Sequence, residues 1–279
     1  MIVTIIGTGL IGGSLALALK NKGIAQQIIG VDANSLHAAK ALALGLVGKI
    51  ENLETAIESS DLIVIAVPVN IVEQILPAVL DKVNKQVVMD VGSIKEGIIK
   101  SVAHHPKRTR FVATHPMWGT EYSGPEAAVN GAFSGRATVI CDASASDSDA
   151  VETVENLYRQ IGMHLVYMNA KEHDMHVAYI SHVSHVISFA LANTVLEKEK
   201  EEDKIFELAS GGFESTVRLA KSHAAMWQPI LMQNRENVLD VLNEYLAQLK
   251  KFKACLEKEN DQYLGELIDN ANKIKRIIK

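Results

Sequence analysis

The sequence predicts an α/β domain with a doubly wound, parallel sheet, followed by an all-α domain. Through residue 169, short apolar runs alternate with helical patterns. Several runs are apolar at every position, which is typical of strands covered on both faces of a parallel sheet. After residue 169 no run looks like a strand. Because alternating strands and helices imply right-handed crossovers, we divide the chain into domains of residues 1–169 and 170–279.

The individual elements follow from the same patterns. The expected strands are short and rich in Ile and Val: Ile2–Ile6, Gln27–Val31, Leu62–Val67, Gln86–Val91, Phe111–Thr114, Ala137–Cys141 and His164–Met168. The expected helices between them are Ile11–Lys22, Leu36–Leu44, Ile71–Val83, Glu96–His104 and Ser148–Gln160. Asn169 and Glu172 are spaced as in a capping box, which predicts a long helix from there to about Lys200. Met226–Lys250 and Tyr263–Ile278 have amphipathic helical patterns.

Composition excludes several classes of function. The 279 residues carry 28 Lys and Arg against 33 Asp and Glu, a net charge of −5 that disfavours binding to nucleic acid. Two cysteines, Cys141 and Cys255, cannot build a disulfide framework and fit a reducing compartment. The chain enters its first strand without a basic leader, and its apolar stretch Leu62–Val72 is too short to cross a bilayer. We therefore expect a soluble, cytoplasmic protein with no membrane partner.

A glycine-rich turn follows the first strand and opens the first helix. The turn has the pattern G-x-G-x-x-G and comprises Gly7, Thr8, Gly9, Leu10, Ile11 and Gly12. In this context the glycines allow a pyrophosphate to lie on the helix N-terminus, as in a Rossmann dinucleotide domain. Asp32, twenty residues after Gly12, would accept hydrogen bonds from a ribose 2′-hydroxyl and repel a 2′-phosphate. The pattern therefore predicts NAD rather than NADP; the alternative is a structural turn with an incidental Asp.

Polar and proline residues follow three other predicted strands at their carboxyl ends, where open α/β sheets bind ligands. Val67 and Pro68 end one strand and would line the cofactor crevice. Ser93 and Lys95 follow the next strand and offer a hydroxyl and an ammonium. His115 follows the Phe111 strand, and a histidine is a natural base for an alcohol that is being oxidised. Each motif also has a purely structural interpretation, as a strand terminator, a helix cap or a loop histidine.

The long predicted helix presents two histidines. At 100° per residue, Asp174, Ala178, Ser181 and His185 lie within about 60° of arc, and His182 lies beside them. A metal site is one alternative, but the helix offers no further ligands at suitable spacing, so we expect no metal. Packing of the histidines between helices is the other alternative.

Arg218 lies further along the helical part, after Gly211 and Gly212. Its guanidinium could clamp a substrate carboxylate in a bidentate manner. The alternative is an exposed arginine on a helix surface.

Taken together, these residues resemble the prephenate/arogenate dehydrogenase family of tyrosine biosynthesis. The matching segments occur in family order: Gly7–Ser14, Asp90–Lys95, His115–Glu121, Asp174–His185, Gly211–Phe213, Arg218 and Met226-Trp227. Enzymes of this family oxidise the ring alcohol of prephenate or arogenate with NAD(P) and release the ring carboxylate as CO2. The product is 4-hydroxyphenylpyruvate or tyrosine.

The resemblance implies roles for particular residues. It implies that His115 hydrogen-bonds or deprotonates the hydroxyl and that Ser93 orients His115 or that hydroxyl. The residues expected to contact substrate are His182, His185, Arg218, Lys95, Glu121 and Trp227. How the contacts divide between His182 and His185 stays open. The resemblance also implies a homodimer formed through the helical domain, which would then be a dimerisation domain.

Some positions depart from the family pattern. Glu214 and Ser215 replace an Arg-Asp pair that commonly follows Gly-Gly-Phe, and Trp118 stands where a small residue is common. We predict an NAD-dependent prephenate dehydrogenase, with arogenate dehydrogenase as the nearest alternative. A β-hydroxyacid dehydrogenase would need a catalytic lysine in the helical domain, and Lys171 is at the wrong end of the long helix. A non-catalytic NAD-binding sensor is the alternative from a different class.

Overall fold

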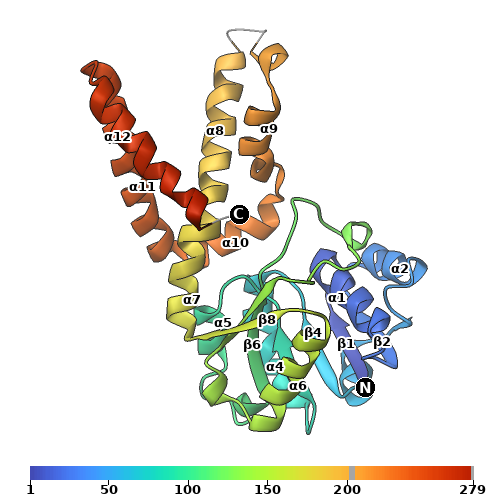
Figure 1. The fold of residues 1–279 in the computed structure, drawn as a ribbon. Helices are drawn as coiled ribbons and strands as arrows, with labels where there is room; N and C mark the ends of the chain where they lie inside the picture. The colour runs from blue at the N-terminus through green and yellow to red at the C-terminus, as the bar shows by residue number, and fades with distance from the viewer. Residues whose placement is uncertain (201–204, 278–279) are drawn as a thin grey trace. The chain divides into compact units, whose positions relative to one another are not determined.

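The computed structural model describes residues 1–200 and 205–277. Its centre is an eight-stranded sheet in the order β3-β2-β1-β4-β5-β6-β7-β8 (Figure 1). The strands are β1 (Ile2–Ile6), β2 (Gln27–Val31), β3 (Lys49–Ile50), β4 (Leu62–Ile65), β5 (Val87–Asp90), β6 (Phe111–Pro116), β7 (Ala137–Cys141) and β8 (His164–Met168). Neighbouring strands run parallel except β6 and β7. The chain order reverses between β1 and β4, which creates the crevice where doubly wound sheets bind ligands.

Helices cover both faces of the sheet. They are α1 (Leu10–Asn21), α2 (Ser35–Ala43), α3 (Leu53–Glu58), α4 (Val69–Lys82), α5 (Glu96–Ser101) and α6 (Ser148–Gln160). One buried cluster joins α1 and α6 to the sheet through residues such as Leu15 and Val154. A second cluster joins α4 and α5 to the other face through Leu76 and Ile98. The predicted doubly wound fold is therefore confirmed.

The antiparallel pair keeps one long loop at the functional edge of the sheet. Because β6 ends at the carboxyl edge and β7 begins beside it, the connection 117–136 stays at that edge. Two short elements, β3 and α3, lie in a stretch for which the sequence predicted no element. A strand of two residues and a helix of six are too short to produce a periodic pattern.

The part of the chain after β8 that the structure describes is helical, as predicted. Its elements are α7 (Ala170–Val177), a π-helical turn (Ala178–His182), α8 (Val183–Glu199), α9 (Gly211–Val217), α10 (Ala224–Gln233), α11 (Arg235–Glu257) and α12 (Asp261–Asn272). Asn169 begins α7 as expected, since its Oδ1 accepts a hydrogen bond from the Glu172 N–H at 2.9 Å. The single helix expected over Met226–Lys250 is instead two helices that meet at Asn234. The expected end of the last helix, Ile278, lies outside the described residues.

The chain forms two compact units, residues 1–234 and residues 235–279. Helices α7–α10 thus belong to the same unit as the sheet, and α11 and α12 form the other. The predicted domain boundary after residue 169 stays a prediction.

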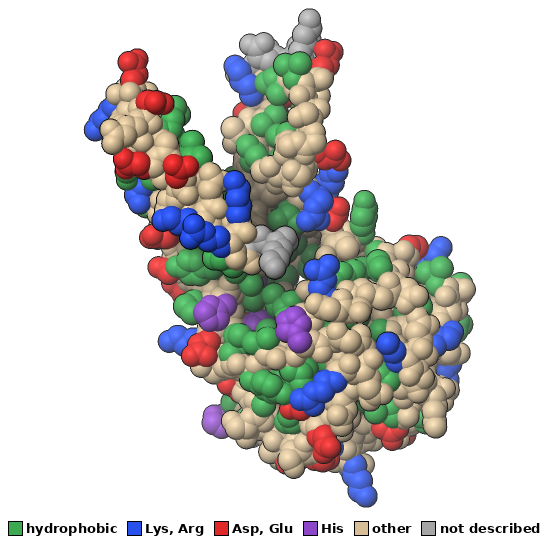
Figure 2. All heavy atoms as spheres, viewed as in Figure 1, with side chains coloured by type: hydrophobic (Ala, Val, Ile, Leu, Met, Phe, Trp, Pro, Cys, Tyr) green, Lys and Arg blue, Asp and Glu red, His purple; other side chains and the backbone are tan. Residues whose placement is uncertain are grey.

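One helical run has unusual surface character. By length and composition alone, Ala170–Glu199 is apolar enough to cross a membrane, a test that helices of soluble proteins also pass. Large apolar side chains on this run are exposed, with Tyr179 at 46%, Ile180 at 66% and Leu196 at 53%. Figure 2 shows apolar side chains at the surface of this helical region. Exposed apolar patches are common where proteins bind other molecules.

Candidate active site

The glycine-rich turn is shaped to hold a pyrophosphate. Gly7 has φ +93°, and a Cβ there would collide with the carbonyl oxygen of Ala66, at the end of β4. A Cβ on Gly12 would collide with the Gly7 carbonyl oxygen, whereas a Cβ on Gly9 would meet no atom within 4 Å. No side chain caps α1, so no side-chain acceptor occupies the N–H groups of its first turn. This combination of close packing and one open side fits a dinucleotide.

Asp32 lies directly after β2 and is hydrogen-bonded to the glycine-rich turn. Its Oδ2 accepts hydrogen bonds from the Thr8 N–H at 2.9 Å and from the Thr8 hydroxyl at 2.8 Å. Its Oδ1 accepts from the Asn34 N–H at 2.9 Å. A carboxylate offers about four acceptor positions, so room for a ribose hydroxyl remains. The arrangement holds the Asp32 carboxylate beside the glycine-rich turn.

The end of β4 borders the same crevice. Val67 packs beside Gly7, and Pro68 is exposed where it caps α4. Within the described residues, the Oδ1 of Asn70 is buried and has no hydrogen-bond partner. Asn70 lies in the first turn of α4, shortly after the end of β4, and the sequence did not indicate this unsatisfied acceptor.

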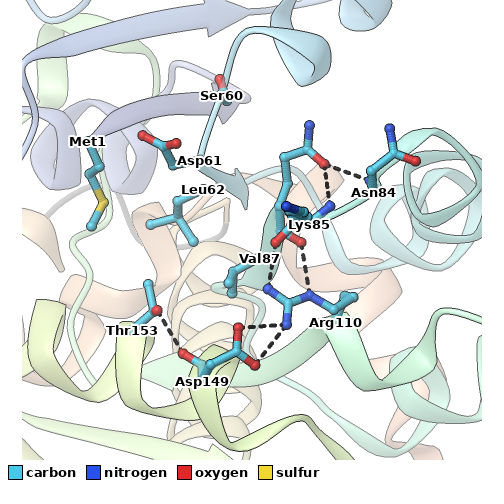
Figure 3. A pocket seen from close by; sticks show the side chains of 11 residues that line it. Met1, Ser60, Asp61, Leu62, Asn84, Lys85, Val87, Arg110, Asp149 and Thr153 are labelled. Carbon is cyan, nitrogen blue, oxygen red and sulfur yellow. Dashed lines mark hydrogen bonds and ion pairs between the residues drawn. The ribbon is translucent and has the colours of Figure 1, made fainter.

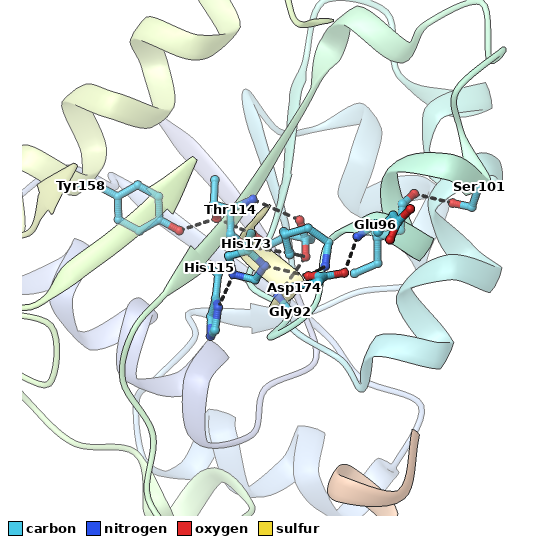
Figure 4. A network of polar contacts seen from close by, with 11 residues as sticks. Gly92, Glu96, Ser101, Thr114, His115, Tyr158, His173 and Asp174 are labelled. Atoms are coloured by element: carbon cyan, nitrogen blue, oxygen red, sulfur yellow. Dashed lines mark hydrogen bonds and ion pairs between the residues drawn. The ribbon is translucent and has the colours of Figure 1, made fainter. Parts of the chain in front are cut away.

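His115 lies on β6 and is bonded to a residue that sequence reasoning missed. The Nδ1 of His115 lies 2.8 Å from the Nε2 of His173 on α7, and the rings meet edge to face. The Nδ1 of His173 lies 2.7 Å from the Oδ1 of Asp174 (Figure 4). Ser93 lies in the loop after the neighbouring strand β5, but in the described structure no hydrogen bond joins it to His115. The observed partner of His115 is therefore His173 rather than Ser93.

The electrostatics of this cluster keep His115 neutral. Burial lowers the pKa of His115 well below its ordinary value, and the nearby His173, Lys95 and His182 lower it further. Burial also lowers the pKa of His173, although the Asp174 carboxylate opposes that effect. A neutral imidazole at neutral pH is able to accept a proton.

Lys95 is placed where it cannot face a substrate. Its side chain is fully buried, and its ammonium donates to the Asp90 carboxylate and, at 2.7 Å, to the Thr114 carbonyl oxygen. The hydroxyl of Thr114 also lies 2.7 Å from that of Tyr158, which is buried. The structure thus corrects the expected substrate contact: Lys95 braces β5 and β6 directly behind His115.

The two histidines of the long helix lie in different surroundings. His182, in the π turn, is 1% exposed, and its Nδ1 lies 3.1 Å from the Asn234 side-chain amide. Burial lowers the pKa of His182 to about 4. His185 is partly exposed and stacks on Trp227, with ring centroids 3.4 Å apart. Of these two histidines, only His185 is partly exposed and could contact a ligand.

Trp227 itself has an unused donor. Its side chain is 7% exposed, and within the described residues its indole N–H has no hydrogen-bond partner. A buried indole N–H normally has a partner, so a ligand atom would satisfy it.

Arg218 and Glu121 complete the cluster. They form an ion pair of 2.8 Å that joins the segment after α9 to the loop between β6 and β7. Arg218 also lies close enough to His185 to lower the pKa of that imidazole, although burial has the larger effect. Glu214 and Ser215 do not take part: Glu214 lies 3.9 Å from Lys221, and Ser215 bonds the Gly212 carbonyl.

The structure also contains a cavity away from these residues. A cavity of about 460 Å³ lies at the opposite, amino edge of the sheet, where the Arg110 guanidinium is held by Asp149 at 2.8 Å (Figure 3). It contains none of the predicted site residues. Among the described residues, no group of three His, Cys, Asp or Glu side chains has the geometry to hold a metal ion.

Comparison with known proteins identifies the family. The family model for the prephenate dehydrogenase nucleotide-binding domain matches residues 15–167. The model for the prephenate dehydrogenase dimerization domain matches residues 169–270. The chain belongs to the prephenate dehydrogenase family. The predicted resemblance is therefore confirmed, and the activity is that of an oxidoreductase acting on a small molecule.

Individual members of the family are similar along most of their length. A prephenate dehydrogenase of Bacillus subtilis is 30% identical over 94% of this chain and 72% of its own. A cyclohexadienyl dehydrogenase of Zymomonas mobilis is 29% identical over 99% of this chain and 96% of its own. The crystal structure of the A. aeolicus prephenate dehydrogenase, in complex with hydroxyphenyl propionate and NAD+, has a TM-score of 0.91 at 28% identity and covers 99% of this chain and 97% of that one. The nucleotide-binding domain and this complex support NAD as the cofactor.

Proposed function

We propose that the protein is an NAD-dependent prephenate dehydrogenase of tyrosine biosynthesis, with His115 as its base. The observation that carries the proposal is a neutral imidazole at the carboxyl edge of the sheet, bonded to His173 at 2.8 Å. It lies in the same compact unit as the dinucleotide turn and the Arg218 cluster. That arrangement supports removal of a proton from an alcohol whose hydride is accepted by a nicotinamide.

His115 would take the hydroxyl proton as the ring alcohol becomes a carbonyl. Bound NAD supplies the acceptor for the hydride that leaves the same carbon. The bond between the ring and its carboxylate then breaks, CO2 leaves, and the bonding electrons complete the aromatic ring. His115 returns its proton to the phenolate oxygen, which restores the neutral imidazole and gives 4-hydroxyphenylpyruvate. The chain has only to orient the groups and move one proton, since aromatisation drives the carbon–carbon cleavage.

Arg218, His185 and Trp227 would hold the substrate carboxylates. Arg218 supplies a guanidinium, Trp227 an unpaired indole N–H, and His185 a partly exposed ring nitrogen. Glu121 favours arogenate as a second substrate, because a carboxylate 2.8 Å from Arg218 could bind an ammonium group. His182 would position Trp227, and Lys95 would position the strand that carries His115, without touching the substrate.

The proposal includes a homodimer. The exposed apolar side chains of Ala170–Glu199 would be covered by a second copy, and the family name for residues 169–270, a dimerization domain, supports this. The same run carries the buried polar residues His173, Asp174 and His182. A helix that crossed a bilayer would separate these residues from water and from a soluble substrate, which argues against a membrane-spanning role. We also propose a cytoplasmic location, in keeping with two cysteines that are free and buried.

The first experiment follows nicotinamide absorbance while prephenate and arogenate are offered separately, each with NAD and with NADP. We expect turnover with prephenate and NAD and release of 4-hydroxyphenylpyruvate. A His115→Asn variant should bind NAD normally and lose about 10²- to 10⁴-fold in kcat. Turnover with arogenate alone would move the assignment to arogenate dehydrogenase. Binding of NAD without turnover of either compound would favour the non-catalytic sensor.

A further inference from the structure

We propose that His173 and Asp174 form a relay that keeps a proton on Nδ1 of His115 and leaves Nε2 as the base. This inference rests on the proposed function for the role of His115. It adds two positioning residues, neither of which touches substrate, and it names the reacting atom. Two hydrogen bonds form the relay: one joins Asp174 to His173, and the other joins His173 to His115 (Figure 4).

The Asp174 carboxylate can only accept hydrogen bonds at this position. Its Oδ1 lies 2.7 Å from the Lys95 backbone N–H, and its Oδ2 lies 2.8 Å from the Glu96 backbone N–H. Because backbone N–H groups are obligate donors, both oxygens are occupied as acceptors. The third neighbour, Nδ1 of His173 at 2.7 Å from Oδ1, must therefore carry its own proton.

That assignment decides the other nitrogen of His173. The ring is 1% exposed, and burial lowers its pKa, so it is neutral and carries one proton. With that proton on Nδ1, the Nε2 of His173 is an acceptor. Its neighbour, Nδ1 of His115 at 2.8 Å, must then be the donor. The lone pair of His115 is thereby placed on Nε2.

The relay also acts after His115 takes a proton. The charged groups near the relay include Lys95, which disfavours a positive charge on His115, and Asp90, which is paired with Lys95. The Asp174 carboxylate lies at the far end of the relay. A second histidine, His182, also lies close by and is neutral at neutral pH. When Nε2 of His115 is protonated, its Nδ1–H can strengthen the bond to His173 without any movement of a proton. In other acid–base triads a carboxylate orients the histidine and stabilises its protonated form. In this protein His173 lies between the carboxylate and the base.

Asp174 ties the relay to the loop that carries Ser93. By accepting from the N–H groups of Lys95 and Glu96, it caps the start of α5 from α7. The same carboxylate therefore orients His173 and holds the start of α5. A displacement of α7 would alter both His115 and this loop.

The tautomer can be measured without substrate. We would record 15N spectra of protein labelled at its ten histidines and identify the His115 signals by their loss in His115→Asn. The relay predicts a protonated, pyrrole-type Nδ1 and a pyridine-type Nε2 at His115. The opposite pattern would overturn the proposal whether or not the protein turns over prephenate.

Three substitutions at position 173 separate the two bonds of the relay. His173→Leu removes both bonds, His173→Asn keeps a donor toward Asp174 only, and His173→Gln places an acceptor near His115. We expect kcat to fall about 10²- to 10⁴-fold in the Leu and Asn variants, with little change in KM, and to be partly restored in the Gln variant. The apparent pKa of the base in kcat/KM should fall in the Leu variant, because the imidazolium loses its acceptor.

His176→Leu is the matched control, since His176 is exposed and lies one turn from His173 on α7. It should leave kcat and the His115 signals unchanged. Wild-type kcat in His173→Leu would overturn the relay. A correct tautomer in a protein that turns over neither substrate would instead overturn the proposed function and leave the relay standing.

Discussion

Lys95 and Asp90 form an ion pair with no exposed surface, directly beneath the catalytic edge of the sheet. The carboxylate of Asp90 also accepts from the Gly92 N–H at 2.8 Å and the Thr114 N–H at 3.2 Å. Such a pair is not by itself strongly stabilising, because desolvation offsets the attraction. Removing one member, however, leaves a buried charge without its partner.

We therefore expect Lys95→Met to destabilise the protein by about 3–5 kcal/mol in urea unfolding. At temperatures where the variant is folded, KM for substrate should change little. Lys100→Met is the control: it removes an exposed pair with Glu96 and should cost less than about 1 kcal/mol. A raised KM with unchanged stability in Lys95→Met would instead show that Lys95 contacts the substrate.

At the scale of elements, the approach of α1 to β1 decides whether the dinucleotide turn forms. Gly12 lies where a Cβ would collide with the Gly7 carbonyl oxygen and press on the Ile5 side chain. Gly9 is different: its φ of −73° is open to any residue, and a Cβ would meet no atom within 4 Å. Packing thus requires a glycine at position 12, whereas Gly9 leaves space for the pyrophosphate.

This contrast predicts opposite behaviour for two alanine variants. Gly12→Ala should lower the free energy of unfolding by about 1–3 kcal/mol, because α1 has to move. Gly9→Ala should keep wild-type stability and lose NAD affinity, since its methyl group occupies the open side of the turn. Thermal unfolding and titration with NAD distinguish the two effects. Equal NAD affinity in Gly9→Ala and the wild type would contradict the assigned position of the cofactor.

At the scale of the whole molecule, four histidines with lowered pKa values gather around one site. Burial is the largest cause for each of them: His115, His173, His182 and His185. The unfolded chain takes up protons at these residues near pH 6.5, whereas the folded protein does so only at lower pH. Stability is therefore complete above about pH 7 and is lost as the pH falls toward the lowered pKa values.

Between pH 7.5 and pH 5, His182 alone should cost about 2 kcal/mol of unfolding free energy, since its pKa is about 4. Urea midpoints measured across this range test the prediction, since most carboxyl groups stay ionised down to about pH 5. A flat profile would show that these imidazoles are solvated. The base should also stay active below pH 6.5, so kcat/KM should fall only at more acidic pH.

Features that depend on local geometry can be predicted from the amino-acid sequence. A turn between a strand and a helix needs glycines at set positions, and a buried parallel strand needs an unbroken apolar run, so Gly7, Gly12 and β1 were predictable. His115 and Asp32 were predictable for the same reason, because each follows a recognisable strand.

Only the tertiary structure decided which polar groups meet. His173 is 58 residues from His115, and Arg218 is 97 residues from Glu121, so no local pattern links either pair. The family resemblance implies a substrate contact for Lys95, but the fold buries its ammonium against Asp90. Periodicity predicts which face of an element is buried, whereas the partner of a buried polar group depends on how distant elements pack.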